Sequence, residues 1–106
     1  MTPEEILQVE KEIVMTLKNV YDPEIPVNIY DLGLVYEINY EPDRTVEIRM
    51  TLTAPNCPMA DDLVAEVHRQ VMKVKGVDAV NVVLTFDPVW NKDMMTDEAK
   101  LELNIF

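Results

Sequence analysis

Residues 45–53 read Thr-Val-Glu-Ile-Arg-Met-Thr-Leu-Thr, an alternation of polar and apolar side chains. In a β-strand, successive side chains point to opposite faces of the sheet, so a period of two separates a buried set from a solvated one. The apolar set is Val46, Ile48, Met50 and Leu52. The stretch therefore predicts a strand in a sheet that is covered on one face only.

Two further strands are expected on either side of this one. Gly33 precedes a run from Leu34 to Tyr40, and the turn at residues 41–44, with its Pro-Asp pair, would join this run to the central stretch as a hairpin. Residues 77–86 alternate again, with apolar side chains on one face at Val80, Val82, Leu84 and Phe86. The sequence therefore predicts three strands.

Helical patterns surround these strands. Thr2 and Glu5 form a capping-box pattern before an apolar stripe of Ile6, Val9, Ile13, Leu17 and Val20, which Leu7 and Val14 widen. Pro58 is expected to open a second helix that ends before Gly76 and buries Leu63, Val64, Val67, Val71 and Val74. A short last helix is expected to begin at Thr96 and to run towards Phe106.

The order α-β-β-α-β-α predicts an α/β fold of the α+β two-layer sandwich type. Its small mixed three-stranded sheet is expected to be covered by helices on one face. The chain has 106 residues, which suits one domain spanning residues 1–106.

The composition of the chain excludes several classes of binding partner and predicts where the protein acts. The chain has 9 basic and 20 acidic residues, a formal charge of −11, so it repels nucleic acid and anionic membrane surfaces. Its start is acidic where a signal peptide is basic, and its one cysteine rules out an internal disulfide. Its two glycines exclude a Gly-rich nucleotide loop. We therefore expect an acidic protein of the cytoplasm.

Cys57 is the first candidate for chemistry. If Pro58 is the first helical residue, Cys57 is the N-cap, and its sulfur lies beside unpaired backbone N–H groups that favour the thiolate. Asp61 and Asp62 in the first turn oppose ionisation. Local chemistry leaves two interpretations open: a functional thiol, or a small apolar residue under a loop.

A closed metal site needs more ligands than one cysteine. Zinc takes about four ligands, and a cluster is usually held by about four thiolates. His68 would lie roughly 15 Å from Cys57 along the helix, which excludes a shared ion or a Cys–His nucleophilic pair. We expect His68 to be solvated or at the edge of the core. A complete metal or cluster site must therefore draw ligands from a second chain or a client.

Two other groups of side chains have a functional and a structural interpretation. The carboxylates Asp22, Glu24, Asp31, Asp87 and Asp93 lie around two loops, where they could bind a cation or meet by chance in an acidic chain. Trp90 and the Met94-Met95 pair would bind partners if exposed, whereas Trp90 could also close the bottom of the core. Met50 and Met72 are expected to fill the core.

Three segments together resemble one family: residues 22–35, 51–58 and 85–90. With the helices and strands between them, the chain resembles the MIP18 family, formerly the DUF59 domain, and most of all its small SufT-like members. The resemblance implies an iron–sulfur cluster assembly domain. It also implies a non-enzymatic factor in metal–sulfur cluster biosynthesis, which helps to deliver or insert clusters into client apoproteins.

The resemblance also assigns a site. The family's reactive cysteine falls on Cys57, which would contact iron or a cluster transiently. The motif loops contribute Asp22, Glu24, Asp31, Thr53, Pro58, Asp87, Pro88 and Trp90. We expect these loops to gather at one end of the fold.

The expected cargo is an iron–sulfur cluster or iron that is shared between chains and not bound permanently. Expected partners are iron–sulfur scaffold or carrier proteins and client apoproteins, and a homodimer would supply a second thiolate. The alternative is a pure protein–protein adaptor that recruits client apoproteins without binding iron or cluster. A thiol-dependent enzyme ranks last, because no base lies near Cys57 in the sequence.

Overall fold

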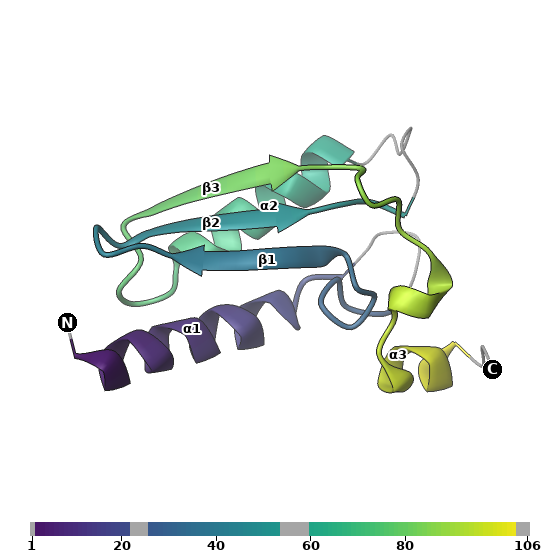
Figure 1. Ribbon diagram of the computed structural model, residues 1–106, viewed down its shortest axis with the longest axis horizontal. Helices are drawn as coiled ribbons and strands as arrows, with labels where there is room; N and C mark the ends of the chain where they lie inside the picture. The colour runs from purple at the N-terminus through teal and green to yellow at the C-terminus, as the bar shows by residue number, and fades with distance from the viewer. Residues whose placement is uncertain (1, 22–25, 54–59, 104–106) are drawn as a thin grey trace.

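The computed structural model describes residues 2–21, 26–53 and 60–103. The predicted order of helices and strands is confirmed, with one added 3-10 helix, η1 (Figure 1). The elements are α1 (Pro3–Leu17), β1 (Val35–Tyr40), β2 (Thr45–Met50), α2 (Ala60–Met72), β3 (Ala79–Leu84), η1 (Lys92–Met94) and α3 (Asp97–Glu102).

The sheet has three strands in the order β1-β2-β3, so β2 lies in the middle. Strand β2 is antiparallel to β1, with Ile48 opposite Ile38, and parallel to β3, with Ile48 opposite Val82. Helices α1 and α2 lie against the same face of the sheet (Figure 1). The predicted mixed sheet with helices on one face is therefore confirmed.

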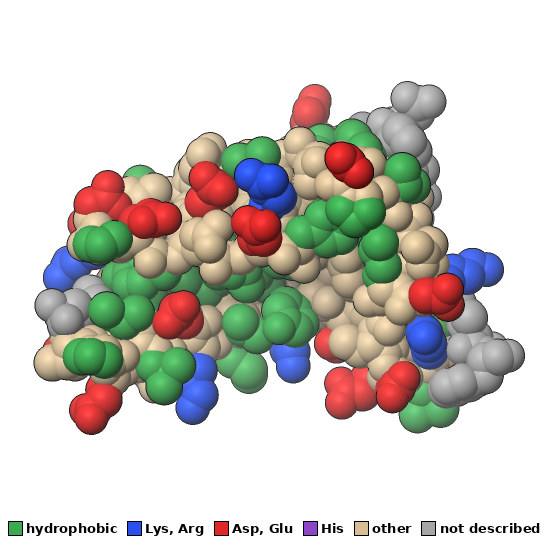
Figure 2. Space-filling view, viewed as in Figure 1, with side chains coloured by type: hydrophobic (Ala, Val, Ile, Leu, Met, Phe, Trp, Pro, Cys, Tyr) green, Lys and Arg blue, Asp and Glu red, His purple; other side chains and the backbone are tan. Residues whose placement is uncertain are grey.

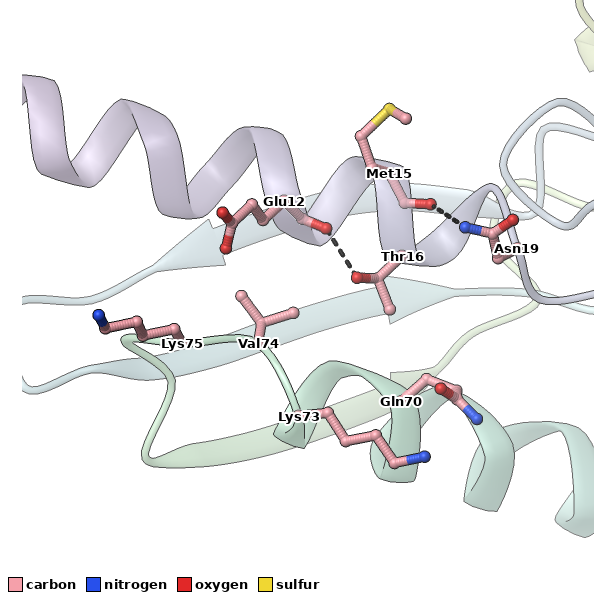
Figure 3. Close-up of a pocket in the computed structure, with 8 residues that line it drawn as sticks. All are labelled: Glu12, Met15, Thr16, Asn19, Gln70, Lys73, Val74 and Lys75. Carbon is pink, nitrogen blue, oxygen red and sulfur yellow. Dashed lines mark hydrogen bonds between the residues drawn. The ribbon is translucent and has the colours of Figure 1, made fainter.

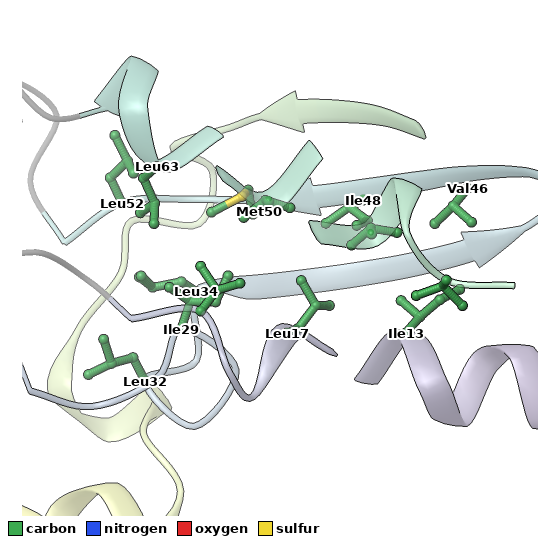
Figure 4. Close-up of a cluster of buried hydrophobic side chains, with 14 of the residues drawn as sticks. Ile13, Leu17, Ile29, Leu32, Leu34, Val46, Ile48, Met50, Leu52 and Leu63 are labelled. Carbon is green, nitrogen blue, oxygen red and sulfur yellow. The ribbon is translucent and has the colours of Figure 1, made fainter. Parts of the chain in front are cut away.

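The core lies between the sheet and these helices. Val46, Ile48 and Met50 of β2 are fully buried, as their alternation predicted. They meet side chains from both helices, including Ile13 and Leu17 of α1 (Figure 4). A fully buried Ile, Leu or Val stabilises the fold by roughly 1.5–3 kcal/mol relative to an exposed one. The middle strand therefore anchors both layers.

Helix α1 begins where the sequence predicted. The Thr2 hydroxyl accepts a hydrogen bond from the Glu5 N–H, and the Glu5 carboxylate accepts one from the Thr2 N–H. This backbone hydrogen bond lowers the pKa of Glu5. The expectation that Leu7 widens the buried stripe is wrong, because Leu7 is 58% exposed, about 200° around the helix from the buried Val9.

Helix α2 buries its predicted stripe at Leu63, Val67 and Val71. Its expected start at Pro58 lies outside the described residues. Met72 is exposed, so the expectation that it fills the core is wrong. Leu84, at the end of β3, is also exposed, because the edge strand is covered less than the middle one.

The C-terminal segment folds back onto the first loop. Thr96 caps α3 as predicted, with its hydroxyl accepting a hydrogen bond from the Ala99 N–H. Met95 and Ala99 are buried in the core. Helix α3 ends at Glu102, before the end of the chain towards which it was expected to run. Within the described ranges, no helix has the length and apolar character needed to cross a membrane.

Candidate functional site

The described parts of the three motif segments lie at one end of the sheet, opposite the β1–β2 hairpin (Figure 1). Backbone hydrogen bonds extend the sheet into this end. The Thr51 N–H donates to the Leu34 carbonyl and the Thr85 N–H to the Met50 carbonyl. Residues after β2 are therefore held between the segments before β1 and after β3.

The first segment is a turn closed by an asparagine. The Asn28 side chain accepts a hydrogen bond from the Asp31 N–H and donates one to the Asp31 carboxylate, both at 2.8 Å. Tyr21 and Asn28 form a β-bridge on either side of the proline-rich loop. Asp31 therefore holds this turn together, while Asp22 and Glu24 lie outside the described residues.

The third segment is anchored to the first through Trp90. The indole N–H of Trp90 donates a hydrogen bond of 2.6 Å to the Leu32 carbonyl, and the half-buried ring packs against the core. The Thr96 N–H donates to the Asp31 carbonyl. These contacts agree with the interpretation that Trp90 closes the bottom of the core.

Gly33 allows the same two segments to approach closely. It has a φ of +81°, and a Cβ atom at this position would overlap the backbone carbonyl of Met94. Met95 is buried and Met94 is half-buried, so the condition for the partner-binding interpretation of this pair, that both are exposed, is not met. Both side chains help to join η1 to the rest of the fold.

The exposed part of the third segment lies around Asp87. A cis peptide bond joins Asp87 to Pro88, and the Pro88 carbonyl accepts a hydrogen bond of 2.7 Å from the Tyr36 hydroxyl. Asp87 and Val89 are exposed, and Figure 2 shows hydrophobic side chains gathered over this region. A partner can therefore reach these side chains of the third segment.

The second segment enters the site through residues 51–53. Thr51 is fully buried, and its hydroxyl has no hydrogen-bond partner among the described residues. Leu52 is buried and Thr53 is half-buried. Cys57 and Pro58 lie outside the described residues, so the structure does not test whether they join the other motif residues.

The described residues do not supply a metal site of their own. No group of three His, Cys, Asp or Glu side chains among them is arranged to hold an ion. His68 is exposed on α2, as expected. With one cysteine, the chain also lacks the thiolates that a cluster requires.

A hollow of about 510 Å³ between α1 and α2 lies away from the motif segments (Figure 3). Its Thr16 hydroxyl donates to the Glu12 carbonyl, and the Asn19 side chain donates to the Met15 carbonyl. These two polar groups are therefore already bonded to backbone carbonyls of α1.

Sequence reasoning missed the residues that assemble this end. Leu32, Tyr36 and Asn28 make hydrogen bonds that hold the motif segments in place. Tyr36 and Pro88 are 52 positions apart, so no local pattern reveals their contact. The Asn28–Asp31 spacing, typical of a side chain that caps a turn, was a usable signal.

A known family matches this chain over most of its length. Residues 10–83 match the family described as "Iron-sulfur cluster assembly protein". That stretch contains β1, β2, α2 and most of α1. The chain belongs to this iron–sulfur cluster assembly protein family, as its motifs predicted.

Relatives of similar size match nearly the whole chain. The chain is 58% identical to an "Fe-S protein maturation auxiliary factor" of Porphyromonas gingivalis, covering 93% of this chain and 94% of that protein. It is 36% identical to the "Fe-S protein maturation auxiliary factor YitW" of Bacillus subtilis, covering 91% and 94%. A crystal structure of a DUF59 domain from Bacillus anthracis aligns with a TM-score of 0.87 at 34% identity, covering 94% and 95%.

Proposed function

We propose that this chain is a maturation factor for iron–sulfur proteins, which helps to deliver or insert clusters into client apoproteins without catalysing a reaction itself. The observation that carries the proposal is the 58% identity, over nearly the full length of both chains, to a protein named as such a factor. Membership of the cluster assembly family supports the same role.

Cys57 is the residue to which we assign contact with the cargo. Its thiolate would accept iron or a cluster transiently, or meet the cysteine ligands of the client. One thiolate leaves the other ligand positions open, so cargo can pass to a partner more readily than from a closed site of about four ligands. The partners would be scaffold or carrier proteins and client apoproteins.

The described part of the site supports this role, because hydrogen bonds fix the residues next to the motif loops. Residues 51–53 lead towards Cys57, and they are fixed by the bond from Thr51 to Leu34. Trp90 in turn fixes the neighbouring segment through Leu32. A rigid base lowers the entropy cost of presenting a reactive side chain to a partner.

A pure adaptor is the second candidate. The exposed Val89, beside the exposed Asp87, offers partner-binding side chains that need no metal. In this case Cys57 would be structural, and the chain would recruit client apoproteins without binding iron or cluster.

The maturation role is tested in cells that lack the gene. We expect iron–sulfur enzymes in such cells to lose cluster occupancy and activity, and a plasmid copy of the gene to restore both. An enzyme without a cluster serves as the control and should be unaffected. Full cluster occupancy across the iron–sulfur enzymes of the deletion strain would contradict the proposal.

The carrier and the adaptor are separated by anaerobic reconstitution with iron and sulfide. A carrier should develop a thiolate-to-iron absorption band that is absent from Cys57→Ala. An adaptor should show no band, while still capturing a client apoprotein in a pull-down. His68→Ala is a matched control, because His68 is exposed and we assign it no ligand role.

A further inference from the structure

Strand β3 is an edge strand whose outer side pairs with no other strand in the described residues. Directly after it, the Thr85 N–H points to β2, where it donates to the Met50 carbonyl at 2.9 Å. Backbone groups alternate in direction along a strand. The N–H and C=O groups of Val80, Val82 and Leu84 therefore point to the open edge.

The side chains of the same three residues line a hollow of about 600 Å³ between β3 and α2. The α2 side of the hollow is formed by Val64, Ala65 and His68, with Asp61 in the first turn. An added strand would place every second side chain on this face of the sheet. The edge thus offers backbone hydrogen bonds and apolar contacts together.

The two edges of the sheet are protected unequally. Edge strands usually carry charges, proline or a bulge that prevents pairing with other chains. Strand β1 has a bulge between Val35 and Glu37 and the charge of Glu37. Strand β3 reads Ala-Val-Asn-Val-Val-Leu, with no charge and no proline. Its edge therefore remains open to pairing.

Charges around β3 indicate what can pair there. Asp78 precedes the strand, Asp87 follows it and Asp61 lines the hollow, and all three are exposed. A second copy paired antiparallel about Val82 would place Asp78 of each copy opposite Phe86 of the other, one position from Asp87. Opposed like charges are destabilising, and each copy carries a net charge of −11. The edge therefore suits a partner strand with basic ends.

We propose that the open edge of β3 binds an extended segment of a partner protein, which adds to the sheet as a further strand. The segment has apolar side chains at alternate positions, which enter the hollow beside α2, and Lys or Arg at its ends, which face Asp61, Asp78 and Asp87. This surface does not depend on Cys57 or on the iron–sulfur role.

A fluorescent peptide, Lys-Lys-Val-Thr-Val-Thr-Val-Lys, tests the proposal by anisotropy with the full chain. Val82→Pro removes one N–H at the open edge and leaves the bonds to β2, which use the neighbouring residues. We expect this variant to bind about tenfold more weakly. Val82→Thr keeps the N–H and the side-chain shape, and its affinity should stay within about threefold.

The charge requirement is tested with the same peptide carrying Glu in place of Lys. This peptide should bind at least about tenfold more weakly to the unaltered protein. Asp61→Lys, at an exposed position, should weaken binding of the Lys peptide and so provides a second variant should Val82→Pro not fold. In NMR spectra, the Lys peptide should shift the amide signals of Val80, Val82 and Leu84.

Four results would overturn the proposal. They are no binding of the Lys peptide to the unaltered protein, equal binding by folded Val82→Pro, equal affinity for the Glu peptide, and amide shifts confined to other surfaces. A dimer in sedimentation experiments that Val82→Pro dissociates would assign the edge to a second copy instead, which also overturns it.

Discussion

The two ends of the sheet are built in different ways. At the hairpin end, the turn itself is closed by a bond between near neighbours, from the Arg44 N–H to the Glu41 carbonyl at 2.9 Å. A long-range bond from the Asp78 N–H to the Arg44 carbonyl, also at 2.9 Å, then joins this turn to the segment before β3. At the loop end, the bond from Trp90 to Leu32 joins segments 58 positions apart. Local turn chemistry therefore explains the hairpin turn, whereas the third motif segment is held against the first by contacts that exist only once the chain has folded.

Gly33→Ala should reveal this difference most strongly. The new Cβ would overlap the Met94 backbone, and the alanine would have to keep a positive φ. We therefore expect a loss of about 3 kcal/mol in the free energy of unfolding. Gly76→Ala is the matched variant towards the hairpin end. Gly76 also has a positive φ, of +97°, so this variant carries backbone strain too. Its Cβ would lie 2.9 Å from a methyl group of Val9, which can shift, so the total loss should be smaller.

Urea denaturation of both variants measures these losses. Equal losses would contradict the expectation that a new side chain is harder to accommodate against the Met94 backbone than against the Val9 side chain.

Trp90→Phe should lower the free energy of unfolding by about 1–2 kcal/mol, because phenylalanine has no N–H to donate to the Leu32 carbonyl. Val89→Ala, at a 66% exposed neighbour, should change stability by less than about 0.5 kcal/mol. Thermal unfolding followed by circular dichroism compares the two. A neutral Trp90→Phe would mean that the indole hydrogen bond does not hold the segments together.

The sequence predicted the parts of the fold that depend on periodicity. The alternation of Val46, Ile48 and Met50 identified the middle strand, and Thr2 with Glu5 marked the start of α1. Met72 was assigned to the core although it is exposed, and the environment of Met95 was left open, because hydrophobicity does not tell which face of an element meets the core. The sequence pattern also did not predict the order of the strands in the sheet.

The candidate site was predicted in its motifs but not in its construction. Asp31 was predicted as a motif residue whose carboxylate could bind a cation or lie near others by chance, whereas this carboxylate accepts a hydrogen bond from Asn28. Its backbone carbonyl also accepts the Thr96 N–H, a contact that depends on the path of the chain after β3. The assignment of Cys57 stays a prediction.

Thr51→Val should change the free energy of unfolding less than Trp90→Phe does, and in the opposite direction. The Thr51 hydroxyl is buried with no partner within the described ranges, so replacing it with a methyl group should stabilise the fold by up to about 1 kcal/mol. Val46→Thr, which adds a hydroxyl at a buried position of β2, should destabilise it. A clear loss of stability in Thr51→Val would mean that the hydroxyl has a partner.

The smallest expected effect concerns Glu5, in a local cap at the hairpin end. Its pKa is lowered in the folded chain by the hydrogen bond from the Thr2 N–H. The carboxylate therefore stabilises the fold above its unfolded pKa, and this contribution is lost as the pH falls through the folded pKa. The stability difference between Glu5→Gln and the unaltered protein should shrink on acidification. A difference that grows would contradict the cap.

The central claim is that Cys57 serves function and not folding. Cys57→Ser should unfold with a free energy within about 1 kcal/mol of the unaltered protein. In a strain lacking the chromosomal copy, the same variant should fail to restore an iron–sulfur enzyme that the unaltered gene restores. Restoration of that enzyme to the full level by Cys57→Ser would contradict the claim.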